Sequence, residues 1–271
     1  VRLDELVEKL NQQDINLEEA LKELDVTPYL DALRERYQQL LTYEPSEDEK
    51  KHVAQERSLL QQLLAENDVL KKHTFSGWRR TNDVIFTTEY ALREPLQKQI
   101  EMRSREAVRT ALHPFGVRVR TTELSQLSRM HAYRELLFTL RIRGTVRGNA
   151  AELSRALLDG GLITLLEELH AETAPFYFRI EVRGMEDTVQ KTALAKELAR
   201  ELEQGSGGRL FNSTTDYEVE LRLIRTKDGS FYPCLKLYTI ADDRFAWRKQ
   251  TISASMHPSL AAALIELARP Y

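Results

Sequence analysis

The sequence predicts an α+β protein that begins with a helical segment. Within residues 1–70 the apolar residues recur at the spacing of amphipathic helices. From residue 73 onward, short alternating or β-branched apolar runs are separated by helical patterns, as in an α+β fold. The 271 residues, 42 % of them hydrophobic, suffice for one large or two modest domains with hydrophobic cores.

Four short helices are expected within residues 1–72. The first two carry their apolar residues at 3–10 and 17–24, and the third begins at Pro28, a residue type favoured in the first turn of a helix. The fourth begins at Ser46, where S-E-D-E is typical of a capping box. Four such helices suggest helical hairpins at the end of a helical-repeat region.

Residues 73–174 are expected to alternate strands and helices. The β-branched run at 83–88 and the apolar–basic alternation at 117–120 predict strands, the second one after a turn at Pro114-Phe115-Gly116. The expected order is a strand at 83–88, a helix from 93 to about 112, a strand at 117–120, a helix from 124 to about 134, a strand at 137–143 and a helix at 150–170.

The clearest strand pattern is the run from Phe176 to Gly184. A helix from about 186 to 203 follows and ends at Gly205-Ser206-Gly207-Gly208. Because this loop follows a helix rather than preceding one, it presents no helix N-terminus to a phosphate. The remaining expected elements are strands at 217–224 and 232–240, a hairpin turn between them at Asp228-Gly229, and a helix at 256–268.

The composition excludes several classes of protein. No stretch approaches the roughly 20 apolar residues of a membrane span, and the first ten residues lack the apolar core of a signal peptide. Cys234 is the single cysteine, so an internal disulfide and a cysteine-based zinc cluster are excluded. The six histidines have no metal-ligand spacing, and no nucleotide-binding or hydrolase motif is present. We therefore expect a cytoplasmic chain with no membrane partner, no metal site and no catalytic residues.

The net charge of −3 hides an uneven distribution. Residues 1–70 hold 8 Lys/Arg and 17 Asp/Glu, residues 71–149 hold 16 and 7, and residues 150–271 hold 15 and 18. The middle segment therefore carries +9, between segments of −9 and −3. Such a basic block predicts a polyanionic partner such as RNA. The alternative is a solvated surface that the acidic first segment neutralises.

The basic candidates for RNA contact lie beside aromatic residues or on predicted strands. A tryptophan next to arginines suits base stacking and phosphate contact, and alternation puts each pair of strand arginines on one face. The predicted RNA-contacting residues are Arg79, Arg80, Arg118, Arg120, Arg141, Arg143, Arg183, Arg244, Trp247, Arg248 and Lys249. Two alternatives stay open. Trp78 could be buried at a domain seam with its arginines outside, and the cluster at 244–250 could hold a linker between domains.

Five segments between Thr81 and Ile240 carry a resemblance to a known family. They are Val84-Ile85-Phe86-Thr87-Thr88, Arg93-Glu94-Pro95-Leu96, Gly116-Val117-Arg118-Val119-Arg120, His131-Ala132-Tyr133-Arg134 and Pro175-Phe176-Tyr177-Phe178-Arg179-Ile180-Glu181-Val182-Arg183-Gly184. This stretch resembles the ferredoxin-like domain plus THUMP domain of RNA-modifying enzymes. THUMP domains also occur in thiouridine synthetases and pseudouridine synthases, so this part of the resemblance implies an RNA partner and leaves the reaction open.

The C-terminal segments at 243–250 and 254–268 narrow the resemblance. They are similar to the junction into a Rossmann-like RNA methyltransferase domain. In that family the junction precedes a D-P-x-C-G-[ST]-G loop that binds S-adenosylmethionine and an N-P-P-[YF] motif that holds the target nitrogen. Neither motif occurs in this sequence. The resemblance therefore implies a chain without a cofactor of its own, from an enzyme whose catalytic domain binds S-adenosylmethionine.

The predicted domains are a helical extension at 1–72, a ferredoxin-like domain at 73–174, a THUMP core at 175–241, and a linker with the first helix of a methyltransferase domain at 242–271. By resemblance the parent enzyme methylates a guanine amino group in tRNA, or in rRNA, and this chain positions the RNA. The acidic extension departs from the family layout and is expected to contact protein. Two alternatives remain: a non-enzymatic helical and basic adaptor for a protein partner, and the THUMP module of a tRNA thiouridine synthetase.

Overall fold

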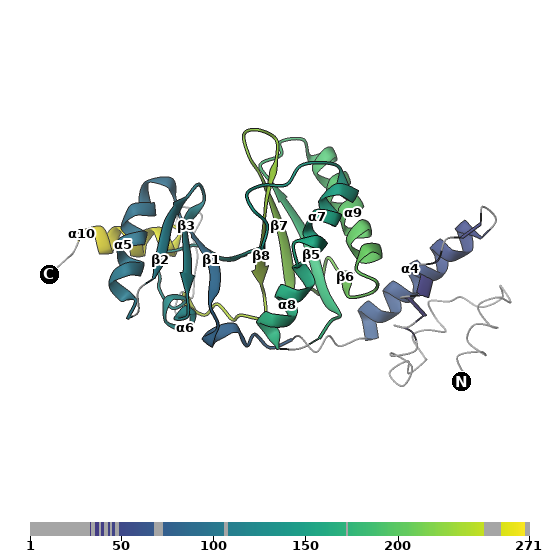
Figure 1. Ribbon diagram of the computed structural model, residues 1–271, viewed down its shortest axis with the longest axis horizontal. Helices are drawn as coiled ribbons and strands as arrows, with labels where there is room; N and C mark the ends of the chain where they lie inside the picture. The colour runs from purple at the N-terminus through teal and green to yellow at the C-terminus, as the bar shows by residue number, and fades with distance from the viewer. Residues whose placement is uncertain are drawn as a thin grey trace. The chain divides into compact units, whose positions relative to one another are not determined.

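The computed structural model of the protein divides the chain into two compact units, Val1–Lys71 and Lys72–Tyr271 (Figure 1). It describes residues 33, 36, 37, 39, 40, 43, 45, 46, 49–67, 73–105, 108–171, 173–246 and 256–268. The first two expected helices, at 3–10 and 17–24, lie outside the described residues. Each unit has its own buried apolar side chains.

The first unit contains α4, Lys50–Asn67, which begins soon after Ser46 as the capping pattern predicts. The Glu49 carboxylate accepts hydrogen bonds from the Ser46 backbone N–H (3.0 Å) and hydroxyl (2.6 Å), so the acidic partner of the capping box is in place. The described residues between 33 and 40 are helical, in agreement with the third expected helix. The buried apolar side chains described in this unit are Leu33, Tyr37, Leu40, Val53, Leu60 and Leu64.

The second unit is built on one mixed eight-stranded sheet with the strand order β2-β3-β1-β4-β8-β7-β5-β6. The strands are β1 (Asn82–Thr87), β2 (Arg109–His113), β3 (Gly116–Thr121), β4 (Leu136–Thr139), β5 (Phe176–Arg183), β6 (Leu210–Asn212), β7 (Val219–Arg225) and β8 (Phe231–Leu237). Strand β5 pairs in parallel with β6 and β7, and all other neighbours are antiparallel. The expected α+β class is confirmed.

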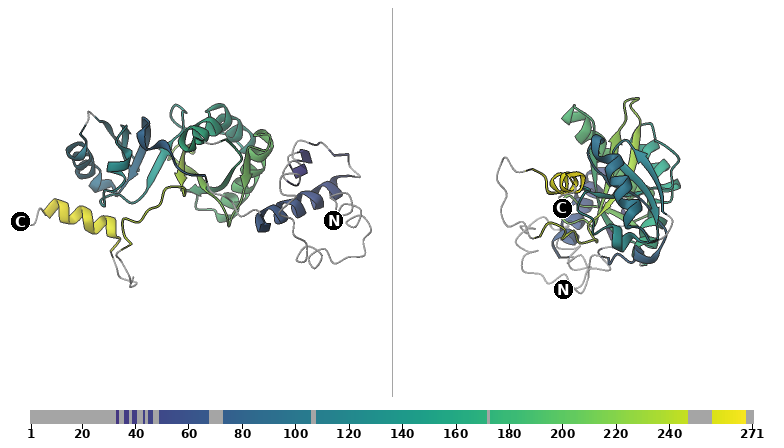
Figure 2. Two further views of the ribbon diagram at one scale, coloured as in Figure 1. Left: turned by 90° about the horizontal axis from the view of Figure 1, so that it is seen from below. Right: turned by 90° about the vertical axis from the view of Figure 1, so that its left-hand side faces the viewer.

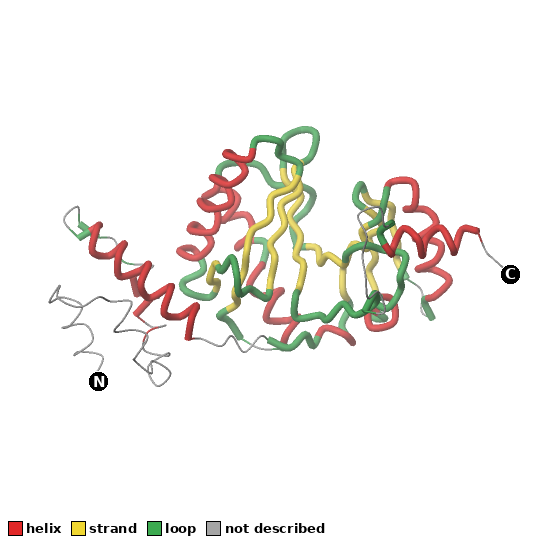
Figure 3. The backbone as a smooth tube through the Cα atoms, turned by 180° about the vertical axis from the view of Figure 1, so that it is seen from behind, coloured by secondary structure: helices red, strands yellow, loops and turns green. Residues whose placement is uncertain are grey.

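Helices cover one face of this sheet. Helix α5 (Arg93–Arg103) packs on β2 and β3, and α9 (Thr188–Gly205) packs on β5 and β6. Helix α7 (Ala150–Asp159) lies against α9, and α10 (Pro258–Ala268) lies beside α5 (Figures 2 and 3). The other helical segments are η2 (Gly77–Arg79), η3 (Tyr90–Leu92), α6 (Leu124–Leu127) and α8 (Leu162–His170). Among the described helices, none is long and apolar enough to cross a membrane.

Alternation along the strands separates an apolar face from a charged face. Val84 and Phe86 of β1 and Leu221 and Leu223 of β7 pack with the helices in one continuous core. The opposite side of the sheet is here named the charged face, and it carries Asp83, Arg118, Arg120, Arg179, Glu181, Arg183, Glu220, Arg222 and Lys236. A small apolar cluster of Ile85, Leu137 and Cys234 lies on this face where β1, β4 and β8 adjoin.

The helix expected to extend from residue 93 to about 112 is shorter in the structure. It ends at Arg103, where Ser104 turns extended and its hydroxyl donates to the Ile100 carbonyl (2.8 Å). Residues 109–113 form β2 instead, which pairs with β3 across the predicted turn. The long-range pairing therefore overrides the local helical pattern, as is common for short strands.

Three other boundaries also differ. The helix expected at 150–170 is broken into α7 and α8 at Gly160-Gly161, because Gly161 has a left-handed backbone (φ 76°). The strand expected at 137–143 ends at Thr139, so Arg141 and Arg143 lie in the loop beyond β4. The helix expected to reach about 134 ends at Leu127, and the three-residue strand β6 was not predicted.

Candidate nucleic-acid interface

Five of the candidate arginines meet around one depression in the second unit. The depression has a volume of about 400 Å³ and is lined by Arg80 after η2, Arg118 and Arg120 of β3, and Arg141 and Arg143 beyond β4. All five side chains are exposed. Sequence alternation could place Arg118 and Arg120 on one face, and the fold brings the other three to them. We call this group the arginine depression.

Two carboxylates hold three of these arginines. Asp83 of β1 forms a bidentate ion pair with Arg118, at 2.8 and 2.6 Å. Glu168 of α8 lies 3.5 Å from the Arg80 guanidinium and also pairs with Arg141. The pairs are exposed, so they contribute little to stability, but they fix where the guanidinium groups lie.

Positive charge remains in excess. The lining contains five arginines and two acidic side chains, a net charge of +3. Within the described part of the chain no ion pair engages Arg120 or Arg143. A free guanidinium offers a planar pair of donors that matches two oxygens of a phosphate. The arrangement can therefore bind a polyanion without first breaking an internal ion pair.

Arg79 is exposed on η2 but does not line the depression. The neighbouring Trp78 is half-buried, and its ring meets Phe75 edge-to-face with 4.7 Å between ring centroids. The Asn82 side chain donates to the Gly77 carbonyl (2.8 Å), which holds the η2 turn against β1. The indole therefore packs against Phe75 while Arg79 faces solvent.

Arg183 lies in a separate cluster on the charged face. The Glu135 carboxylate, just before β4, accepts hydrogen bonds from Arg222 of β7 (2.5 and 3.1 Å), Lys236 of β8 (3.1 Å) and Arg183 of β5 (3.4 Å). Burial raises the pKa of Glu135, but Arg222 and Lys236 outweigh burial and bring it to about 2. Arg183 therefore faces a carboxylate that is ionised at neutral pH and is less available to RNA than Arg120.

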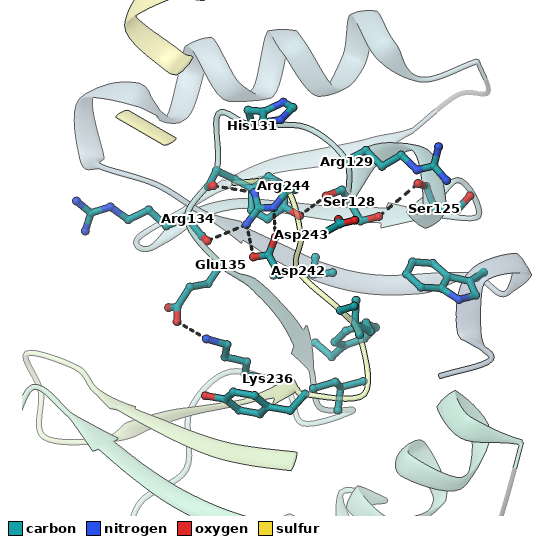
Figure 4. A pocket seen from close by; sticks show the side chains of 18 residues that line it. Ser125, Ser128, Arg129, His131, Arg134, Glu135, Lys236, Asp242, Asp243 and Arg244 are labelled. Atoms are coloured by element: carbon teal, nitrogen blue, oxygen red, sulfur yellow. Dashed lines mark hydrogen bonds and ion pairs between the residues drawn. The ribbon is translucent and has the colours of Figure 1, made fainter. Parts of the chain in front are cut away.

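Arg244 is buried, in contrast to its assignment as an RNA contact. Its guanidinium donates to the backbone carbonyls of Met130 (3.1 Å), Tyr133 (3.0 Å) and Arg134 (3.1 Å) and to the Asp242 carboxylate (2.6 and 2.7 Å) (Figure 4). These bonds use all five N–H donors of the side chain. Arg244 therefore holds the segment after β8 to the loop before β4. The last three candidates, Trp247, Arg248 and Lys249, lie outside the described residues.

A larger depression of about 990 Å³ adjoins Arg244, and sequence analysis did not predict it (Figure 4). Its charged side chains nearly balance, because Arg129, Arg134, Lys236 and Arg244 face Glu135, Asp242 and Asp243. Several are also paired to each other, as in Lys236 with Glu135. With a net charge of +1 against +3, it is the weaker candidate for a polyanion.

The described residues hold no group of three His, Cys, Asp or Glu side chains that could bind a metal ion. The histidines near α8 form hydrogen bonds within the fold. The His73 Nδ1 lies 2.9 Å from the Glu218 carboxylate, and the His170 Nε2 lies 2.8 Å from the Thr239 hydroxyl. Burial raises the pKa of the Cys234 thiol to about 12, so the thiol is protonated and unreactive at neutral pH.

Comparisons with known proteins give structural neighbours only. No protein-family model and no curated protein matches the chain. Thirteen chains of solved structures match it. TrmN from Thermus thermophilus is 18 % identical over 69 % of this chain and 54 % of that chain, with a TM-score of 0.44. PH1313 from Pyrococcus horikoshii Ot3 is 10 % identical over 58 % and 56 % (TM-score 0.36), and a 4-thiouridine synthetase in an RNA complex with bound ATP is 12 % identical over 59 % and 44 % (TM-score 0.36). The chain thus spans about half the length of these structures.

Proposed function

We propose that this chain is the RNA-binding part of a tRNA-modifying methyltransferase and that the arginine depression holds the RNA backbone. The observation that carries the proposal is the excess of positive charge there, with Arg120 and Arg143 exposed and outside any ion pair of the described residues. Phosphates dominate the affinity of proteins for nucleic acids, and arginine binds them in a bidentate fashion.

The topology supports the proposed domain names. The elements β1-α5-β2-β3-α6-β4 follow one another with the antiparallel strand order β2-β3-β1-β4, which is the order of a ferredoxin-like split βαβ unit. We propose this unit as the ferredoxin-like domain and the part around β5–β8 as the THUMP domain. Because α7 packs on α9, we include α7 and α8 in the THUMP part, so that its boundary moves from residue 175 to near Asn149.

The depression is suited to positioning rather than to choosing a sequence. Contacts to phosphate fix where an RNA lies and carry no information on its bases. Arg118 and Arg141, each oriented by a carboxylate, would set the direction of the backbone, and Arg120 and Arg143 would add the charge. The target base and its selection then belong to another part of the enzyme.

S-adenosylmethionine is expected in the parent enzyme from the resemblance of the C-terminal segments. This sequence contains no D-P-x-C-G-[ST]-G loop, so its residues do not fit the cofactor. The proposed role of residues 256–268, most of which form α10, is to connect the RNA-binding part to the cofactor-binding domain. The proposed target is a guanine amino group of tRNA.

The test is the salt dependence of tRNA binding by variants that each lose one arginine. Arg118→Ala, Arg120→Ala, Arg141→Ala and Arg143→Ala are each titrated with tRNA at several salt concentrations. Each lost phosphate contact should reduce the slope of log Kd against log salt by about 0.7 to 0.9. Arg200→Ala is the matched control, because Arg200 is also exposed but lies on α9 outside the depression.

Two results would contradict the proposal. Binding of tRNA with no dependence on salt would favour the adaptor alternative, in which a protein surface is the partner. Equal effects of Arg200→Ala and Arg120→Ala would show that the arginine depression has no special role.

A further inference from the structure

Three aromatic rings from two parts of the sheet meet on the charged face. His113 and Phe115 lie at the tip of the β2–β3 hairpin, and Tyr232 lies on β8. The ring centroids of His113 and Tyr232 are 4.8 Å apart, those of His113 and Phe115 4.9 Å, and those of Phe115 and Tyr232 5.9 Å. All three side chains are only half-buried. We call them the aromatic triad.

The aromatic triad adjoins the arginine depression through Arg118. Arg118 of β3 pairs with Ala111 of β2, and His113 lies two residues further along the same face of β2, so the two side chains are diagonal neighbours across the strand pair. Arg118 also lines the depression. The Arg93 guanidinium of α5 donates a hydrogen bond to the His113 carbonyl (2.9 Å) and so holds the tip of the β2–β3 hairpin in place. Aromatic surface and phosphate-binding groups are therefore continuous on one face.

His113 contributes an uncharged ring. Burial, reinforced by Arg118 and Arg93, lowers its pKa to about 4. The Phe115 backbone N–H lies 3.4 Å from the His113 Nδ1, which accepts this contact only without a proton. The triad therefore presents three neutral rings at neutral pH, so any contribution it makes to binding comes from stacking and apolar contact rather than from charge.

We propose that the aromatic triad is a stacking site for an unpaired base whose adjoining phosphate lies in the arginine depression. The inference rests on the proposed RNA-binding function and deepens it, because it names single-stranded RNA as the ligand class at this face. In a duplex the bases are stacked on one another and paired, whereas an unpaired base can turn out and stack on an aromatic side chain. Rings beside a guanidinium provide both parts of such a contact.

The test separates stacking from charge. Phe115→Leu and Tyr232→Leu keep an apolar side chain but remove the ring, and each is titrated with a short single-stranded RNA and with a blunt duplex of equal length. The Kd for the single strand should rise about 5- to 150-fold, since stacking of one base contributes roughly 1–3 kcal/mol. The salt slope should stay unchanged, because no phosphate contact is lost. The Kd for the duplex should not change.

The conservative variant and the control sharpen the result. Tyr232→Phe keeps the ring and should bind the single strand as the unchanged protein does. Tyr43→Leu removes an exposed tyrosine (44 %) of the first unit and should have no effect. Thermal unfolding of each variant identifies any that does not fold. The deciding comparison is then between the single-strand Kd values of Tyr232→Phe and Tyr232→Leu.

Three outcomes would overturn the inference: an unchanged Kd for the single strand in both leucine variants, an equal loss for single strand and duplex, or a reduced salt slope like that of Arg120→Ala. These outcomes differ from a failure of the proposed function, which would show as salt-independent binding by the unchanged protein. If the arginine variants behave as expected and the leucine variants do not, only the stacking site is rejected.

Discussion

The Glu135 carboxylate accepts two hydrogen bonds, at 2.5 and 3.1 Å, from the guanidinium of Arg222, a side chain that is only 1 % exposed. Arg222 also pairs with the Glu220 carboxylate. The contact joins β7 to the residue before β4, beside the Phe138–Leu235 and Thr139–Cys234 pairs at which β4 and β8 hold the two halves of the sheet together. Removing the main partner of a buried cation strongly destabilises the fold, because the remaining charge is buried without compensation.

Glu135→Gln should therefore lower the free energy of unfolding by about 3 kcal/mol, measured by urea denaturation. Lys236→Met is the matched control, because the Lys236 side chain is 30 % exposed and its loss uncovers no buried charge. That variant should lose no more than about 1 kcal/mol. Equal losses in the two variants would show that the Arg222 contact is not the critical one.

The buried Glu203 carboxyl makes stability depend on pH. Burial raises its pKa to about 7, opposed by one hydrogen bond from the Asn212 backbone N–H (2.7 Å). The folded protein thus binds the Glu203 proton more tightly than the unfolded chain does. The resulting gain in folding stability is fully present below pH 4.5 and is lost as pH rises through 7. The loss amounts to as much as about 3 kcal/mol.

Glu203→Gln should flatten the pH profile between 4.5 and 7, as measured by thermal unfolding across that range. Glu135 affects stability at acidic pH instead. Because its pKa in the folded protein is lowered to about 2, its contribution to folding stability is present above pH 4.5 and is lost as pH falls toward 2. A Glu203→Gln profile with the slope of the unchanged protein would contradict the account of Glu203.

Arg244 should matter for stability and not for RNA. Arg244→Lys cannot fill the three carbonyl contacts and the carboxylate together, so it should lower the free energy of unfolding by about 2 kcal/mol. The salt slope of RNA binding should stay unchanged. Arg129→Ala, at an exposed arginine of the neighbouring loop, should alter neither quantity. A reduced slope for Arg244→Lys would return Arg244 to the RNA surface.

Gly116 and Gly144 both have a positive φ but differ in the space around them, so Gly→Ala at the two positions can be compared. At Gly116, with φ +157°, a Cβ would lie 2.0 Å from the Phe86 carbonyl oxygen, inside the β1–β3 pairing. At Gly144, with φ +78°, a Cβ would meet nothing within 4 Å. Gly116→Ala should therefore cost several times the roughly 1 kcal/mol expected of Gly144→Ala, by chemical denaturation. Similar costs would mean that the close approach at Gly116 relaxes easily.

Part of the fold could be predicted because its signals are local. The β-branched run of β1, the hairpin turn before β8 and the cap of α4 depend on neighbouring residues, and the structure has each of them. Strand β2 could not be predicted, since its exposed residues gain their conformation from pairing with β3. A local sequence pattern does not show which strand a segment will pair with.

The candidate site shows the same limit. The identity of the arginines followed from charge and alternation, but their meeting in one depression depends on Glu168 of α8 and on the end of β4, which are distant in sequence. Arg244 looked similar to them in the sequence. Its burial results from the carbonyls of the loop before β4, and no sequence signal marks those carbonyls as its partners.

The central claim is that the exposed arginines of the depression that form no ion pair with a described residue contact RNA phosphates. The double variant Arg120→Gln/Arg143→Gln tests it most directly. Its tRNA affinity is measured against salt beside that of the unchanged protein, with Arg200→Gln as the control. The slope of log Kd against log salt should fall by about 1.4 to 1.8, twice the change for one lost contact, with thermal stability unchanged. An unchanged slope in the double variant would contradict the claim.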